Sequence, residues 1–97
     1  MAAYMIFMRD KTRDPKQLEL HAKTAKASLV GFPIIRRAVY GRHEVLEGPP
    51  TEGVVILEFP SFDEAKAWYD SPAYHESREH RLLGADFRCV IVEGVSP

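Results

Sequence analysis

The segment Val54–Phe59 constrains the fold more than any other part of this sequence, because it reads as a strand that is apolar on both faces. Side chains along a strand alternate between the two faces of a sheet, and a sheet with one wet face shows apolar and polar residues in alternation. Here every residue except Glu58 is apolar. The run Tyr4–Arg9 is also apolar at both sets of positions, apart from its last residue. A sheet built from these strands therefore needs a cover on each face.

Capping and turn residues divide the rest of the chain into further elements. Asp14-Pro15 and Ser71-Pro72 each place a capping side chain before a proline, which fits the first position of a helix. Ser61-Phe62-Asp63-Glu64 has the pattern of a capping box. The predicted strands are Tyr4–Arg9, Ile34–Tyr40, Val54–Phe59 and Phe87–Glu93, with a short extended piece at His43–Glu47. The predicted helices run from Pro15 to before Gly31, and from Phe62 to about His80 with a break at Ser71.

This order of elements contains two β-α-β units, which is the pattern of the α+β, ferredoxin-like fold. In that fold the strands form one antiparallel sheet, and right-handed crossovers place the helices on one face. We expect residues 1–97 to form a single domain with few residues left to cover the other face. A second copy of the chain is the simplest cover, because one self-complementary surface then closes on itself. We therefore predict a homodimer in which two sheets face each other.

Charge and composition exclude several classes of partner. The formal net charge is -1 and acidic and basic residues are interleaved, so no basic stripe for a phosphate backbone is present. No apolar run reaches the roughly 18 residues that span a bilayer, and the N-terminus lacks the features of a secretory signal. We expect a cytoplasmic protein that binds neither nucleic acid nor membrane.

The sequence also contains no recognisable metal or cofactor motif. Of the four histidines, His75 and His80 are five positions apart, whereas a zinc-binding pair on a helix is four apart. A glycine-rich phosphate loop and a nucleophile elbow are absent from the sequence. We therefore predict no metal site and no cofactor. The single cysteine, Cys89, lies in an apolar run and is expected to be a small buried side chain.

Glu58 is the first candidate for a catalytic residue, because it interrupts the most apolar strand. A carboxylate in such surroundings is costly unless it is paired or protonated, and such groups gather at functional sites. Its natural partner is Arg36 or Arg37 on the preceding strand, since these two point to opposite faces. The alternative is a purely structural ion pair at the end of a strand.

A second group of candidates lies in the second helical region. Tyr74 and Arg81 are seven positions apart and share a helical face, where a hydroxyl and a guanidinium could bind a carboxylate. A surface salt link from Arg81 to Glu47 or Glu93 fits the spacing equally well. Trp68 is either part of the same ligand site or a core residue, because helical spacing from Ala65 favours burial.

The sequence resembles the family known as domain of unknown function 1330. The residues that carry the resemblance are Leu46-Glu47-Gly48, Val55–Ser61, Ala67–Tyr74 and Arg81. The resemblance implies a dimeric α+β barrel, a superfamily that also contains cofactor-free monooxygenases, haem-degrading enzymes and stress-responsive proteins, and it implies no established activity. The polar residues that match the family pattern, and are therefore candidate site residues, are Glu47, Glu58, Ser71, Tyr74 and Arg81. The chain departs from the pattern at Gly31-Phe32-Pro33, where the resemblance implies two glycines, so Phe32 is expected near any cavity.

Two functions of different classes fit these observations. The first is a cofactor-independent enzyme or small-molecule binder, with a site between sheet and helices or at the dimer interface. In this hypothesis Glu58 is the acid or base, and Arg81 and Tyr74 orient a small anionic metabolite with Trp68, Ser71 and Glu47 nearby. The second is a non-catalytic dimeric module whose charged residues only brace the interface.

Overall fold

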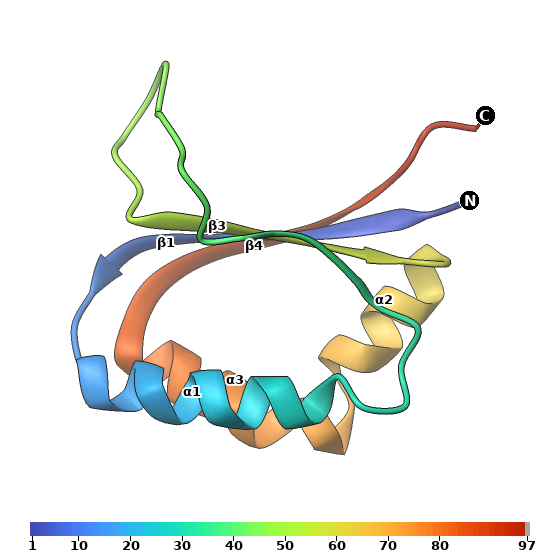
Figure 1. Ribbon diagram of the computed structural model, residues 1–97, viewed down its shortest axis with the longest axis horizontal. Coiled ribbons are helices and arrows are strands. Elements are labelled where there is room, and N and C mark those ends of the chain that lie inside the picture. The colour runs from blue at the N-terminus through green and yellow to red at the C-terminus, as the bar shows by residue number, and fades with distance from the viewer. Residues whose placement is uncertain (97) are drawn as a thin grey trace.

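Within residues 1–96, which the computed structural model describes, four strands and three helices follow one another in the predicted order (Figure 1). They are β1 (Ala3–Thr12), α1 (Pro15–Ser28), β2 (Ile35–Val39), β3 (Gly53–Phe59), α2 (Phe62–Tyr69), α3 (Pro72–Gly84) and β4 (Ala85–Glu93). The strands form one antiparallel sheet in the order β2-β3-β1-β4, and all helices lie on one side of it. The predicted α+β, ferredoxin-like fold is confirmed.

The predicted capping residues begin the helices. Side-chain oxygens of Asp14, Ser61 and Ser71 accept hydrogen bonds of 3.1–3.2 Å from backbone N–H groups in the first turns of α1, α2 and α3. Each bond satisfies an amide that has no partner within the helix. The break between α2 and α3 falls at Ser71, as the cap followed by proline predicts. It lets α3 turn and run beneath the sheet alongside α1 (Figure 1).

The two faces of the sheet carry alternate residues of each strand. Met5 and Phe7 of β1 pair with Leu57 and Val55 of β3 and point toward the helices. With Phe59, Ala65, Trp68 and Tyr74, the buried members of this set form the hydrophobic core. The other set of positions points away from the helices, and we call this side the open face. Its side chains include Tyr4, Ile6, Met8, Ile35, Ala38, Val54, Ile56, Glu58, Arg88, Val90 and Val92.

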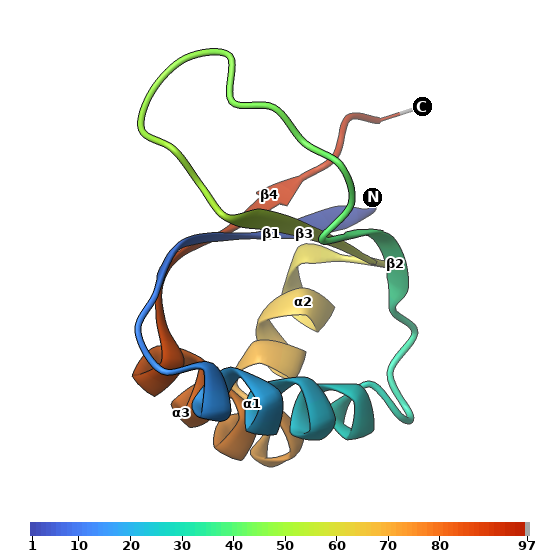
Figure 2. The ribbon, with the colours of Figure 1, turned by 60° about the vertical axis from the view of Figure 1, so that its left-hand side comes forward.

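Two expectations about local structure are wrong. His43–Glu47 forms no strand and belongs to a loop of residues 40–52 that rises on the open-face side of the sheet (Figure 2). Tyr40 has a left-handed backbone φ of 54°, which turns the chain off the sheet, so the segment has no neighbouring strand with which to pair. Cys89 is exposed, because β4 is an edge strand and the helices do not cover it completely.

We predict that Met5→Ala lowers the free energy of unfolding by about 2–5 kcal/mol, because Met5 is fully buried and its truncation leaves a cavity in the core. Met5→Leu is the matched control and is expected to cost less than about 1.5 kcal/mol, because it keeps the volume. Urea unfolding followed by the fluorescence of the single tryptophan measures both. Equal stabilities for the two variants would contradict this description of the core.

Candidate functional site

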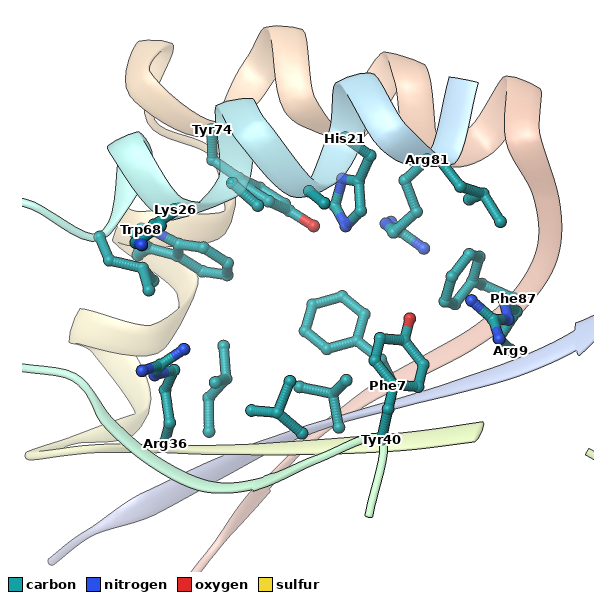
Figure 3. Close-up of a pocket in the computed structure, with 17 residues that line it drawn as sticks. Phe7, Arg9, His21, Lys26, Arg36, Tyr40, Trp68, Tyr74, Arg81 and Phe87 are labelled. Carbon is teal, nitrogen blue, oxygen red and sulfur yellow. The ribbon is translucent and has the colours of Figure 1, made fainter. Parts of the chain in front are cut away.

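A cavity of about 380 Å³ lies between the helix-facing side of the sheet and helices α1 and α3 (Figure 3). Its walls are largely apolar and include Phe7, Val55, Leu57, Trp68 and Phe87. This volume is within the range of small-molecule sites. The cavity is therefore large enough for a small organic ligand.

The charged groups around the cavity all have the same sign. Arg9, Lys26, Arg36 and Arg81 line it, and its lining residues include no aspartate or glutamate. Arg9 has a counter-ion outside the cavity, since its Nε lies 3.0 Å from a carboxylate oxygen of Glu52. The other three cations form no salt bridge with any residue of 1–96. The cavity therefore has a positive potential that favours an anion.

Arg81 is the most deeply buried of these cations. Helix α3 carries it into the interior, where its side chain lies over the rings of Phe7 and Phe87 at 5.1 and 5.0 Å. The residue is 2% exposed. One guanidinium N–H donates to the hydroxyl of Tyr69 at 3.2 Å, whereas Nε has no hydrogen-bond partner. A buried cation without a carboxylate partner is costly, and it is an unusual feature in a domain of this size.

Tyr74 and Trp68 form an aromatic wall next to Arg81. Their rings stack with centroids 4.0 Å apart, and the indole N–H donates to the carbonyl of Ser28 at 3.2 Å. Burial raises the pKa of Tyr74 to about 12, although the positive charge of Arg81 acts in the opposite direction. The phenol therefore stays protonated at neutral pH and can donate a hydrogen bond into the cavity.

His21 of α1 also lines the cavity, and its ring is held by α3. Its Nδ1 lies 3.0 Å from the carbonyl oxygen and 2.9 Å from the hydroxyl of Ser77. A carbonyl only accepts hydrogen bonds, so Nδ1 carries the proton and Nε2 is the free acceptor of the neutral ring. Burial lowers the pKa of His21, and the charges of Arg81 and His80 lower it further, against the effect of the Ser77 carbonyl. Figure 3 shows the far edge of the ring pointing into the cavity.

Tyr40 closes the cavity from the end of β2. Its ring occupies the space that a side chain on Gly53 would need, so a glycine is required opposite it. The guanidinium of Arg9 lies 4.7 Å from the centre of the Tyr40 ring. Burial raises the pKa of Tyr40, so this second phenol is also protonated at neutral pH. The left-handed backbone conformation of Tyr40 therefore places its ring as one aromatic wall of the cavity.

The structure brings three of the predicted site residues together and separates the other three. Trp68, Tyr74 and Arg81 line the cavity. Ser71 caps α3 and also donates to the carbonyl of Trp68 at 2.7 Å, so its side chain is occupied by the backbone. Glu47 is exposed in the loop of residues 40–52, away from the cavity. The ligand-binding roles of these residues remain predictions.

Glu58 lies on the open face, with the sheet between it and the cavity. Its carboxylate pairs with Arg37, whose Nε is 3.1 Å away. Arg36 is on the opposite side and lines the cavity, as the alternation along β2 predicts. A catalytic role for Glu58 remains a prediction, and it would require a site on the open face.

Sequence reasoning missed His21 and Tyr40 as site residues. The metal-ligand spacing of the histidines does not single out His21, although it is three positions after Leu18 and four before Ala25 on the inward face of α1. That spacing was the available signal. For Tyr40, no sequence signal specified the left-handed turn that directs the ring into the cavity. Phe32 packs against the hydrophobic core and is not among the residues that line the cavity.

We predict that folding stability falls as the pH drops below about 6.5 and that His21 causes part of this loss. The unfolded chain takes up a proton near the ordinary histidine pKa of 6.5, whereas the folded state resists it until the lowered pKa of His21 is reached. Melting temperatures from about pH 8 to about pH 5 should therefore decline less in His21→Asn than in the wild type. His75→Asn, which changes an exposed histidine of α3, is the control. Identical pH profiles for the wild type and His21→Asn would contradict the prediction.

Several solved structures share this fold. A protein of unknown function from Rhodopseudomonas palustris is 21% identical, with 99% of this chain and 84% of the other covered and a TM-score of 0.69. A dimeric protein of unknown function with a ferredoxin-like fold from Bacteroides fragilis is 17% identical, with 96% of each chain covered and a TM-score of 0.61. SnoaB, a cofactor-independent oxygenase from Streptomyces nogalater, is 14% identical, with 99% and 95% covered and a TM-score of 0.63. At these identities the similarity shows the fold alone.

The comparison of sequences gives the family. No curated protein matches the chain. The model of the family described as domain of unknown function (DUF1330) matches residues 2–95, which is nearly the whole sequence and includes every residue that lines the cavity. The chain therefore belongs to the DUF1330 family, as its sequence motifs predict.

Proposed function

We propose that the protein binds a small, partly apolar organic anion in the cavity between its sheet and its helices. The observation that carries the proposal is Arg81, a buried guanidinium with no carboxylate partner within residues 1–96 and a free Nε–H. A carboxylate of the ligand would supply the missing counter-ion and form the charge-assisted hydrogen bonds that such a group makes best.

The rest of the cavity specifies the remaining part of the ligand. Aromatic and aliphatic walls surround the guanidinium, so the body of the ligand is an apolar or aromatic group of modest size. Lys26 and Arg36 lie on the opposite side of the cavity from Arg81 (Figure 3). They add to the attraction for negative charge without being buried themselves. An anionic metabolite with a short apolar body fits this arrangement.

We also propose that the protein is a homodimer through its open face. That face is apolar at its centre, where Ile56 pairs with Ile6, and Val90 and Val92 on the edge strand are 54% and 47% exposed. The loop of residues 40–52, which rises on the same side, carries Leu46 with 83% of its surface exposed. Similar structures from Bacteroides fragilis and Thermobifida fusca are described as dimeric, which supports this proposal.

A structural role on the open face is the second candidate function for the charged residues there. The ion pair of Glu58 with Arg37 lies next to the apolar centre of that face. If two sheets meet there, the pair would be partly desolvated by the partner and would fix the register of the two copies. Binding in the cavity and association through the open face are then separate properties of one sheet.

We predict that Arg81→Met weakens the binding of small carboxylates at least tenfold, because it removes the buried partner of the anion. Isothermal titration with benzoate, pyruvate and phenylpyruvate as probes measures the effect. The folded state of Arg81→Met is expected to be at least as stable as the wild type, since a buried unpaired charge is replaced by an apolar side chain.

The matched control is Arg78→Met, one turn earlier on the same helix. Arg78 contacts Asp70 and the ring of Tyr69 and does not line the cavity. This variant is expected to bind the probes as the wild type does. Wild-type protein that binds none of the carboxylates, or equal losses in the two variants, would remove the basis of the proposed function.

We predict that Ile56→Asp converts the dimer to a monomer, because it places a charge at the apolar centre of the open face. Leu83→Asp is the control, since Leu83 is an exposed apolar residue on α3, remote from that face. Gel filtration with light scattering at micromolar concentration measures the mass of each. A monomeric wild type would refute the dimer.

A further inference from the structure

We infer that His21 is a catalytic base that removes a proton from a carbon next to the carbonyl group of a bound 2-oxo acid, with Arg81 and Tyr74 stabilising the resulting enolate. This inference rests on the proposed function, because it needs an anion in the same cavity. It adds a reaction, proton transfer at carbon, and it assigns the base to a residue of α1.

The geometry of His21 is that of a positioned base. Its Nδ1–H is held by the carbonyl and hydroxyl oxygens of Ser77, and the Ser77 hydroxyl in turn donates to the carbonyl of His21 at 3.0 Å. These bonds link α1 to α3 and fix both the ring orientation and the tautomer. Nε2 is left without a hydrogen-bond partner in residues 1–96 and faces the cavity. In many enzymes, a hydrogen-bond acceptor on one ring nitrogen orients the catalytic histidine in this way, while the other nitrogen faces the substrate.

Among the residues that line the cavity, His21 is the side chain that can accept a proton near neutral pH. The lining residues contain no aspartate, glutamate or cysteine, and His21 is their one histidine. The phenols of Tyr40 and Tyr74 have raised pKa values and so are donors rather than bases. Glu58, which follows the cavity-lining Leu57 in the chain, is on the other side of the sheet. A base near neutral pH is therefore provided by α1 and not by β3.

The groups beside His21 suit the charge that develops. The ring centroids of His21 and Tyr74 are 6.3 Å apart, and Arg81 is close enough to lower the pKa of His21. In Figure 3 the Tyr74 hydroxyl and the Arg81 guanidinium point into the cavity on either side of the His21 ring. A phenol and a guanidinium that are fixed before the ligand arrives can stabilise an oxyanion without reorganising.

The proposed step balances without any further reactant. The proton on the carbon next to the ketone moves to Nε2, and the electron pair of that C–H bond forms a carbon–carbon double bond. The π electrons of the ketone move onto its oxygen, which becomes the enolate oxyanion that Arg81 and Tyr74 stabilise. Return of the proton to the oxygen gives the enol, and its return to the carbon restores the ketone. The activity is thus an enolisation that exchanges the carbon-bound proton with water.

The test is hydrogen–deuterium exchange into pyruvate, 2-oxobutyrate and phenylpyruvate in deuterium oxide, followed by proton nuclear magnetic resonance. With wild-type protein, at least one probe should lose its proton signal at least about 100-fold faster than in buffer alone. His21→Asn should bring the exchange back to the buffer rate and keep the titrated affinity for the probe within threefold. Asparagine can still donate to Ser77 but has no basic nitrogen.

His75→Asn is the control, because His75 is an exposed histidine on α3 that pairs with Glu79 and does not line the cavity. It should keep the wild-type exchange rate. Binding of a probe with exchange at the buffer rate, or unchanged exchange in His21→Asn, would overturn the role of His21 and leave the proposed anion site intact. Wild-type protein that binds no probe would overturn the proposed function, and this inference with it.

Discussion

The alternation of side chains along the four strands is the constraint on which the rest of the structure depends. Because helices cover one face of the sheet, one set of positions builds the core and the cavity, and the other set builds the open face. Leu57 and Glu58 are neighbours in the chain and yet belong to different surroundings. A single strand thereby contributes to both the candidate site and the proposed dimer interface.

The burial of Arg81 is the main energetic peculiarity of the molecule. Contacts with two phenylalanine rings and one bond to Tyr69 compensate part of its lost hydration, and no carboxylate among residues 1–96 neutralises it. Folded proteins retain such uncompensated groups mainly at functional sites, where the stability that they forgo is recovered when a ligand binds. On this view the cavity is organised before the ligand arrives, and binding completes its electrostatics.

Sequence reasoning found the fold because its signals are local. The caps at Asp14, Ser61 and Ser71, together with the apolar strands, specify the order of helices and strands. Few fold topologies are compatible with that order. It also grouped Trp68 with Tyr74 and Arg81, since they come from one helical region. It could not determine that Arg81 lacks a counter-ion, because that depends on where every carboxylate lies in space. It placed a strand at His43–Glu47 for a similar reason, since extended propensity says nothing about available neighbours.

The pairing register of β3 determines the charge of the cavity. Leu57 faces the helices, and Glu58, one position later, faces away from them. A slip of one residue would exchange the two sets of positions, bringing the carboxylate to the side of the sheet that faces Arg81 and an aliphatic side chain to the open face. The cavity would then contain its own anion and would have no need of one from outside. The hydrogen-bond ladder between β1 and β3 therefore keeps the carboxylate of Glu58 out of the cavity and also maintains the hydrophobic core.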